Sequence, residues 1–114
     1  MYLLLAGLAV ILIFSYFYYK YKRKSVACLM YHNVFPEKTE GIISEKEFEK
    51  HMEYIKDMKT YKMEELEKMN YILDEKSILV TFDDGYKNNY TKAFSILKKY
   101  NIKATIFLNT VYIE

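Results

Sequence analysis

The stretch Ile78-Leu79-Val80-Thr81-Phe82-Asp83-Asp84-Gly85 carries an apolar run directly into two adjacent carboxylates and a glycine. Residues 78–82 are typical of a buried strand. Gly85 then allows the backbone to turn sharply. Carboxylates that follow a buried strand lie where α/β sheets and barrels carry their functional sites. Asp83 and Asp84 are therefore the first candidates for a functional site.

The acidic pair admits two interpretations. In the simpler one, one aspartate caps the following helix and the other is solvated in a turn. In the second, the two carboxylates perform different tasks, such as metal ligand and proton acceptor, because successive side chains of extended backbone point to opposite sides. The surrounding sequence decides between them.

Apolar residues after the acidic pair predict a parallel α/β unit. Residues 104–108 read as a second buried strand, and a helix is expected between the two strands. Asn88 or Asn89 is a candidate cap for this helix, and Asn101 is a candidate left-handed stop. Strand, helix and strand within about thirty residues form a parallel unit. The fold class is therefore α/β, with an open or barrel-shaped parallel sheet.

The residues before the pair add further elements. Residues 26–31 predict a buried first strand, with His32 at its carboxyl end. Ser44 and Glu47 have the spacing of a capping box and predict a helix start, and apolar residues then recur at helical spacing. His51 on this helix is interpreted as structural or solvated. Residues 60–74 are ambiguous and are consistent with a second short amphipathic helix.

The amino-terminal segment has a different character. Residues 2–19 contain no charge, and as a helix they would extend over roughly 27 Å, close to the bilayer's hydrocarbon thickness of about 30 Å. Aromatic and basic side chains follow this run, as at a membrane interface. The sequence therefore predicts a transmembrane anchor over residues 1–21 and a basic linker over 22–25. One alternative is a cleaved signal peptide, but such a peptide carries its charges before the apolar run, and here they follow it. The other alternative is a buried helix of a soluble protein.

The composition limits the partners. Apolar residues make up 52% of the 114-residue chain and charged residues 28%, which fits an anchor joined to a globular part. The basic residues gather after the apolar run, so no nucleic-acid footprint is evident. Cys28 is the single cysteine and forms no internal disulfide.

The motif resembles the polysaccharide deacetylase family, the NodB-homology group also called carbohydrate esterase family 4. The resemblance covers about residues 26–113 and rests on the first of the family's motifs, Thr81-Phe82-Asp83-Asp84-Gly85, followed by Ala93, Leu97 and Ile102-Lys103-Ala104-Thr105-Ile106-Phe107. Leu29-Met30-Tyr31-His32-Asn33-Val34, with Phe48, His51, Met52 and Leu66, is similar to the branch that deacetylates poly-β-1,6-N-acetylglucosamine.

The resemblance implies a distorted (β/α) barrel that removes acetyl groups from N-acetylated sugars with zinc or another divalent ion. Matched onto the motif, Asp83 would be the catalytic base and Asp84 a metal ligand. The metal would polarise the acetyl carbonyl while Asp83 accepts the proton of the attacking water. His32 would line the substrate cleft. No separate cofactor-binding residue is implied.

The chain carries only part of this machinery. The family's other two metal ligands are a histidine pair separated by three residues, whereas His32 and His51 are the only histidines here. Residues 26–114 are therefore expected to be a partial domain, truncated at its carboxyl end, which follows one transmembrane helix and is inactive on its own. Two alternatives remain: a non-catalytic, membrane-bound interaction module, and a receiver-like signalling domain with an acidic pair.

The expected partners are the lipid bilayer and an acetylated polysaccharide. Basic residues after a span favour leaving that flank in the cytoplasm. The glycan substrates that the resemblance implies lie at the cell surface, so a single-pass membrane protein with an extracytoplasmic domain is expected against the charge rule.

Overall fold

The computed structural model describes residues 1–21, 25–37, 40, 42–73 and 75–112. A four-stranded parallel sheet organises the part that follows the first helix. Its strands are β1 (Val26–Tyr31), β4 (Lys59–Tyr61), β5 (Ser77–Asp84) and β6 (Ala104–Leu108). A separate pair of short parallel strands, β2 (Val34–Phe35) and β3 (Ile43–Ser44), lies beside it. The α/β class is confirmed.

β5 is the centre of the sheet because it pairs with all three other strands. β1 runs along one side of it from Val26↔Ser77 to Tyr31↔Phe82. On the other side, β4 pairs with the first half of β5 and β6 with the second half, from Val80↔Ala104 to Asp84↔Leu108. The strand that carries the acidic pair is thus held on both edges.

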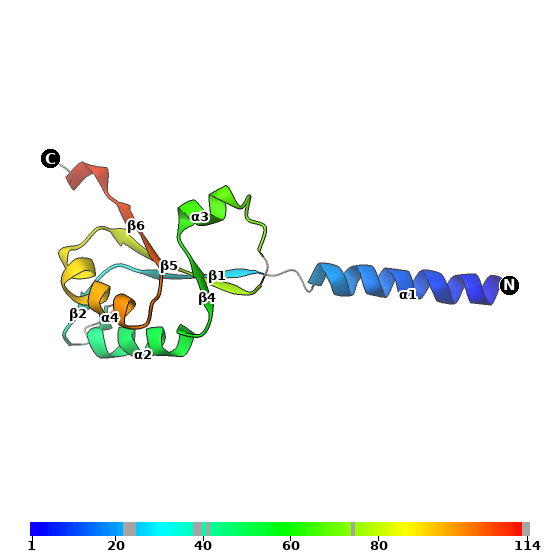
Figure 1. Cartoon of the computed structure of the whole chain (residues 1–114), viewed down its shortest axis with the longest axis horizontal. Helices are drawn as coiled ribbons and strands as arrows, with labels where there is room; N and C mark the ends of the chain where they lie inside the picture. Colours follow the sequence, from blue (N-terminus) through cyan, green and yellow to red (C-terminus); the bar gives the residue numbers. More distant parts are fainter. Residues whose placement is uncertain (22–24, 38–39, 41, 74, 113–114) are drawn as a thin grey trace.

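Three helical elements cover one face of the sheet (Figure 1). They are α2 (Glu45–Ile55), the π-helical turn η1 (Asn89–Ala93) and α4 (Phe94–Lys99). Alternate residues of β1 and β5 face them, since Tyr31, Val80 and Phe82 belong to the same buried cluster as Phe48 and Met52 of α2. The predicted start of α2 is confirmed: Ser44 caps the helix, and its hydroxyl accepts from the Glu47 N–H in a capping box.

The opposite face is covered by α3 (Met63–Lys68) near the start of β5 (Figure 1). Leu66 of α3 packs with Tyr61 and Leu79 in a second, smaller buried cluster. Here the sequence prediction was incomplete: residues 60–74 contain the end of a strand as well as a helix, and the helix is shorter than predicted. β4 has three residues, too few for periodicity to reveal, and only its pairing with β5 defines it as a strand.

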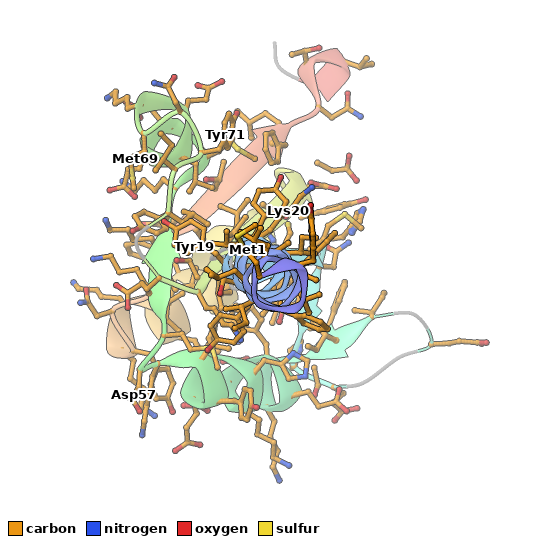
Figure 2. All side chains as sticks on the ribbon, turned by 90° about the vertical axis from the view of Figure 1, so that its right-hand side faces the viewer. Met1, Tyr19, Lys20, Asp57, Met69 and Tyr71 are labelled. Atoms are coloured by element: carbon orange, nitrogen blue, oxygen red, sulfur yellow. The ribbon has the colours of Figure 1, made fainter. Side chains whose placement is uncertain are left out.

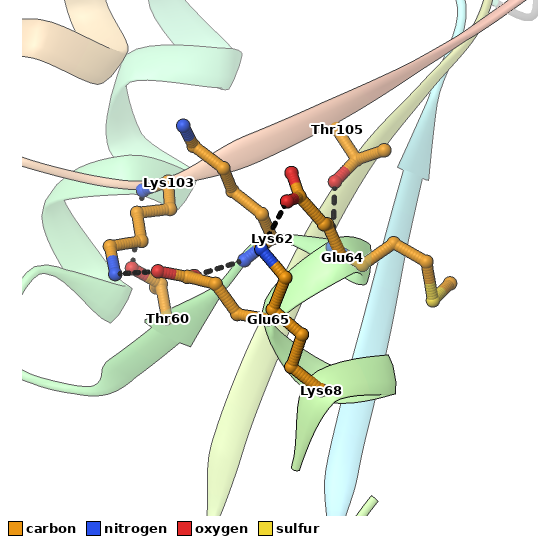
Figure 3. A network of polar contacts seen from close by, with 8 residues as sticks. Thr60, Lys62, Glu64, Glu65, Lys68, Lys103 and Thr105 are labelled. Atoms are coloured by element: carbon orange, nitrogen blue, oxygen red, sulfur yellow. Dashed lines mark hydrogen bonds and ion pairs between the residues drawn. The ribbon is translucent and has the colours of Figure 1, made fainter. Parts of the chain in front are cut away.

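A polar network joins β4, α3 and β6 (Figure 3). Thr60 Oγ1 accepts from the Lys103 N–H at 3.2 Å, and Thr105 Oγ1 accepts from the Met63 N–H at 2.9 Å. Glu65 accepts from Lys103 Nζ at 2.6 Å and from the Lys62 N–H at 2.8 Å. The hydrogen bond from Lys103 is the main reason that the pKa of Glu65 lies below its ordinary value. These bonds allow β4 and β6 to share one side of β5.

The first helix, α1 (Tyr2–Tyr21), extends away from the sheet (Figure 1). Every residue of α1 whose exposure is described is exposed, and Figure 2, which looks along the helix, shows side chains all around it. Within the described residues, no helix combines the length and the apolar character needed to cross a membrane. The predicted transmembrane segment is therefore not supported by the structure. The basic residues 22–24 of the predicted linker lie outside the described residues.

The buried hydroxyl of Thr60 provides a test of the polar network. Thr60→Val keeps the shape of the side chain but leaves the Lys103 N–H without its acceptor, which should lower the free energy of unfolding by about 1 kcal/mol. Guanidinium unfolding of the full chain in detergent, followed by circular dichroism, measures the change. The matched control Thr91→Val changes an exposed threonine and should have little effect; equal effects of the two variants would contradict this role of Thr60.

Candidate functional site

The register between β1 and β5 brings the predicted site residues together. Because Tyr31 lies opposite Phe82, His32 leaves β1 at the level where Asp83 continues β5. His32 Nε2 lies 3.9 Å from Asp83 Oδ2, with the two side chains 48% and 32% exposed. An imidazole and a carboxylate in this arrangement form an open, polar pair that solvent or a ligand can reach. The prediction placed both residues at the carboxyl ends of strands, and the structure confirms that position.

His32 also lines a shallow hollow of about 200 Å³. The other residues around this hollow are Met30, Tyr31, Asn33, Ile42 and Ile43. It lies at the end of β1, beside the turn that leads to β2. The hollow fits the predicted position of His32 at a cleft, although the sequence did not indicate which residues would form its walls.

Asp84 ends β5 in a different backbone conformation. Its φ of 70° and the φ of 69° at Gly85 are both left-handed, so the chain turns immediately after the acidic pair. Both aspartates belong to β5, whereas the sequence predicted them in the turn after a strand ending at residue 82. Pairing with β6 extends the strand through Asp84, which lies opposite Leu108.

The described residues do not form a metal site. Among the residues that the structure describes, no group of three or more histidine, cysteine, aspartate or glutamate side chains could hold an ion. Asp84 is a suitable oxygen ligand by its chemistry, but structural and catalytic zinc sites take at least three protein ligands. The described residues therefore do not complete the ligand set that the sequence resemblance implied.

Asn88 and Asn89 contribute to the site in a way that the sequence did not predict. Neither side chain caps the following helix, so the predicted capping role is wrong. Instead, Asn89 Nδ2 donates to the His32 carbonyl oxygen at 2.7 Å, and Asn88 Nδ2 donates to Asn33 Oδ1 at 3.0 Å. These partners are more than fifty residues away in sequence, which explains why local pattern analysis missed them.

An aromatic cluster in the core contains the residues that directly precede His32 and Asp83. Tyr31 packs edge-on against Phe48 at 5.0 Å between ring centroids and lies 5.7 Å from Phe82. Burial raises the pKa of Tyr31 to about 12, so its phenol is neutral at physiological pH. Its hydroxyl is hydrogen-bonded to His51 Nδ1 at 2.9 Å. His51 therefore has a structural contact, in line with one of its two predicted interpretations, and it lines a separate hollow with Leu29 and Ile55.

The fold and site define a parallel α/β domain with an acidic site at the carboxyl ends of its strands. The family model described as polysaccharide deacetylase matches residues 70–114. YxkH of Bacillus subtilis strain 168, whose name assigns it to the polysaccharide deacetylases, is 38% identical over 93 residues, which cover 76% of this chain and 33% of YxkH. The chain belongs to the polysaccharide deacetylase family, and not to the receiver-like class that the sequence left open.

Solved structures agree with this membership. IcaB from Ammonifex degensii has a TM-score of 0.64 and 32% identity, over 75% of this chain and 38% of that protein. The Streptococcus pyogenes deacetylase PplD, solved in complex with acetate, has a TM-score of 0.59 and 30% identity, over 71% of this chain and 41% of PplD. The chain thus spans 33% of the length of YxkH, 38% of IcaB and 41% of PplD, which is less than half of each protein.

Gly85 allows a test of the turn after the acidic pair. A Cβ at this position would lie 2.5 Å from Leu108 Cδ2, and φ is 69°. Gly85→Ala should therefore lower the free energy of unfolding by about 1 kcal/mol, mainly through left-handed backbone strain, because the exposed Leu108 side chain can move aside. The same denaturant titration measures it. Gly7→Ala is the control: its Cβ meets no atom within 4 Å, and it should not destabilise the chain.

Proposed function

We propose that the chain provides the acidic part of the active site of a deacetylase that acts on N-acetylated polysaccharides. The observation that carries this proposal is the pairing of Asp83 with His32 at the carboxyl ends of two parallel strands, in a chain of the polysaccharide deacetylase family. The chain is similar in sequence to the branch of the family that deacetylates poly-β-1,6-N-acetylglucosamine, and we therefore propose this polymer as the substrate.

The reaction is hydrolysis of an acetamide. Water adds to the acetyl carbonyl carbon, the C–N bond breaks as the nitrogen takes up the proton that the water gave up, and the products are acetate and a free amine on the sugar. Asp83 is the group suited to accept the proton of the attacking water, because its carboxylate is partly exposed at the open end of the site. His32 lines the hollow beside Asp83, where it would contact the acetamide of a bound substrate.

Asp84 has a separate proposed role as one ligand of a divalent ion, with zinc as the metal. Its position next to Asp83, on a left-handed backbone that turns away after the strand, supports a division of tasks between the two carboxylates. The described residues contain no complete group of metal ligands. The remaining ligands would therefore come from outside the described residues.

A chimaera tests both roles. The full chain is joined to the part of YxkH that it does not match, and acetate release from β-1,6-linked N-acetylglucosamine oligomers is measured together with zinc binding by calorimetry. Asp83→Asn should reduce turnover by about 10²- to 10⁴-fold and leave zinc binding intact, because it removes the proton acceptor only. Asp84→Ala should abolish zinc binding and turnover together.

Asp57→Asn serves as the control, since Asp57 is exposed and distant in sequence from the acidic pair. It should change neither quantity. A folded chimaera that releases no acetate would overturn the proposed activity. An Asp83→Asn variant as active as its parent would overturn the role of Asp83 alone.

We also propose that α1 attaches the domain to a membrane. The helix presents exposed apolar side chains along its length, including Leu8 and Leu12, at 57% and 64% exposure. Large exposed apolar surfaces mark sites of contact with a membrane or another protein. Because the proposed substrate is a cell-surface glycan, we place the domain on the extracytoplasmic side.

Flotation with phosphatidylcholine vesicles tests the attachment. The full chain should float with the vesicles, whereas Leu8→Asp combined with Leu12→Asp should remain in the dense fraction, because each aspartate makes transfer of the helix into lipid costly. Lys46→Asp combined with Lys50→Asp changes exposed residues of α2 at the same spacing and should still float. Flotation that is equal for all three proteins would contradict attachment through α1.

The side of the membrane is tested with the single, exposed cysteine. A membrane-impermeant maleimide should label Cys28 in intact cells if the domain is extracytoplasmic. Labelling only after lysis would reverse the proposed orientation.

A further inference from the structure

The π-helical turn η1 and its first flanking residue reach across to the turn after β1. Asn89 Nδ2 binds the His32 carbonyl oxygen at 2.7 Å, and Asn88 Nδ2 binds the side chain of Asn33 at 3.0 Å. Two consecutive residues of one segment therefore hold two consecutive residues of the other. π-helical turns occur frequently at functional sites.

The side chain of Asn89 is not explained by the needs of its own helix. It is 4% exposed and provides no cap. Among the described residues, its Oδ1 has no hydrogen-bond partner, and the same holds for Asn88 Oδ1. A buried, unpaired polar atom costs about 1–3 kcal/mol, so an apolar side chain of similar volume would suit the packing at least as well. The contribution of Asn89 is the single hydrogen bond to the His32 backbone.

That hydrogen bond acts at the residue whose ring faces the acidic pair. His32 is itself 48% exposed at its side chain and follows the last residue of β1, so neither packing nor the sheet ladder fixes its backbone carbonyl. Asn89 is fixed, because it shares the buried side of η1 with Ala93, which is fully buried in the main core. A rigid segment thus fixes the backbone of an exposed one.

We propose that Asn89 is a positioning residue that holds His32 beside Asp83, and that Asn88 aids it by holding Asn33. Asn89 acts through His32 and does not itself contact the reacting groups. Its relevance to turnover rests on the proposed deacetylase function, whereas its effect on His32 is a property of the fold and is tested separately.

The two asparagines differ in what they tolerate. The partner of Asn88 is another side-chain amide, which can rotate to present its NH₂ group to an acceptor. The partner of Asn89 is a backbone carbonyl, which can only accept. A carboxylate at position 88 can therefore still bind Asn33, at the cost of charge on a buried oxygen, because Asn88 Oδ1 has no hydrogen-bond partner among the described residues. Loss of the donor at position 89 removes the hydrogen bond altogether.

Nuclear magnetic resonance of the full chain in detergent micelles, with ¹⁵N-labelled histidine, gives two backbone amide signals, because His32 and His51 are the only histidines. In Asn89→Leu the order parameter of the His32 amide should fall from about 0.85 to below about 0.6, while His51 in α2 stays unchanged as an internal reference. Asn88→Asp should leave both signals as they are in the parent chain.

An unchanged His32 order parameter in Asn89→Leu would overturn the proposal. If the His51 signal shows that Asn89→Leu is unfolded, the order parameter of His32 is measured in Asn89→Ser instead. The serine side chain is too short to reach the His32 carbonyl oxygen, so the same loss of order is expected. In the YxkH chimaera, Asn89→Leu should reduce kcat by about 10- to 100-fold with KM little changed. If the chimaera with the parent sequence shows no activity, the deacetylase proposal is refuted. If the His32 order parameter nevertheless falls in Asn89→Leu, the positioning inference still stands.

Discussion

The parallel pairing of β1 with β5 is the constraint on which the site depends. It sets Tyr31 opposite Phe82 and so brings His32 to the level of Asp83. A slip of one residue would turn every side chain of β1 to the other face of the sheet. Tyr31 would then leave the aromatic cluster, and either Met30 or His32 would take its place against the core, depending on the direction of the slip. The buried face therefore fixes the register, and the register fixes the site.

Core and site are connected residue by residue. In both strands the residue directly before the functional one is a buried aromatic: Tyr31 precedes His32, and Phe82 precedes Asp83. Because side chains alternate along a strand, a ring that packs into the core directs the next residue toward the opposite side. Phe48 of α2, with no exposed surface, lies against both rings and ties them together. The geometry of the polar pair is thus set by apolar contacts beneath it.

The sequence predicted the elements whose signals are local. The position of the strand over residues 26–31, the capped start of α2 and the left-handed Asn101 are confirmed, because periodicity, a capping box and a turn residue each act within a few positions. The predicted burial of the strands over residues 26–31 and 104–108 is wrong: Tyr31 is the one buried residue of the first, and the second has none, since little of the described chain covers them. β4 and the true extent of β5 were missed because partner strands distant in sequence define them. The same reason hid the role of Asn89, since an asparagine at the start of a helical segment is locally indistinguishable from a cap.

The two adjacent carboxylates share one neighbouring strand and differ in a second contact. Asp83 lies opposite Phe107 and Asp84 opposite Leu108, so both pair with β6. Asp83 in addition faces His32 at the end of β1, where Asn89 of η1 binds the His32 carbonyl oxygen, whereas Asp84 is followed by Gly85, whose space Leu108 limits. β6 in turn is attached to β4 and α3 by the polar network around Thr60 and Glu65. A disturbance on the β1 side should therefore reach Asp83 first, whereas one on the β6 side should reach both carboxylates. The contact with His32 thus distinguishes Asp83 from Asp84, in keeping with the separate tasks proposed for a proton acceptor and a metal ligand.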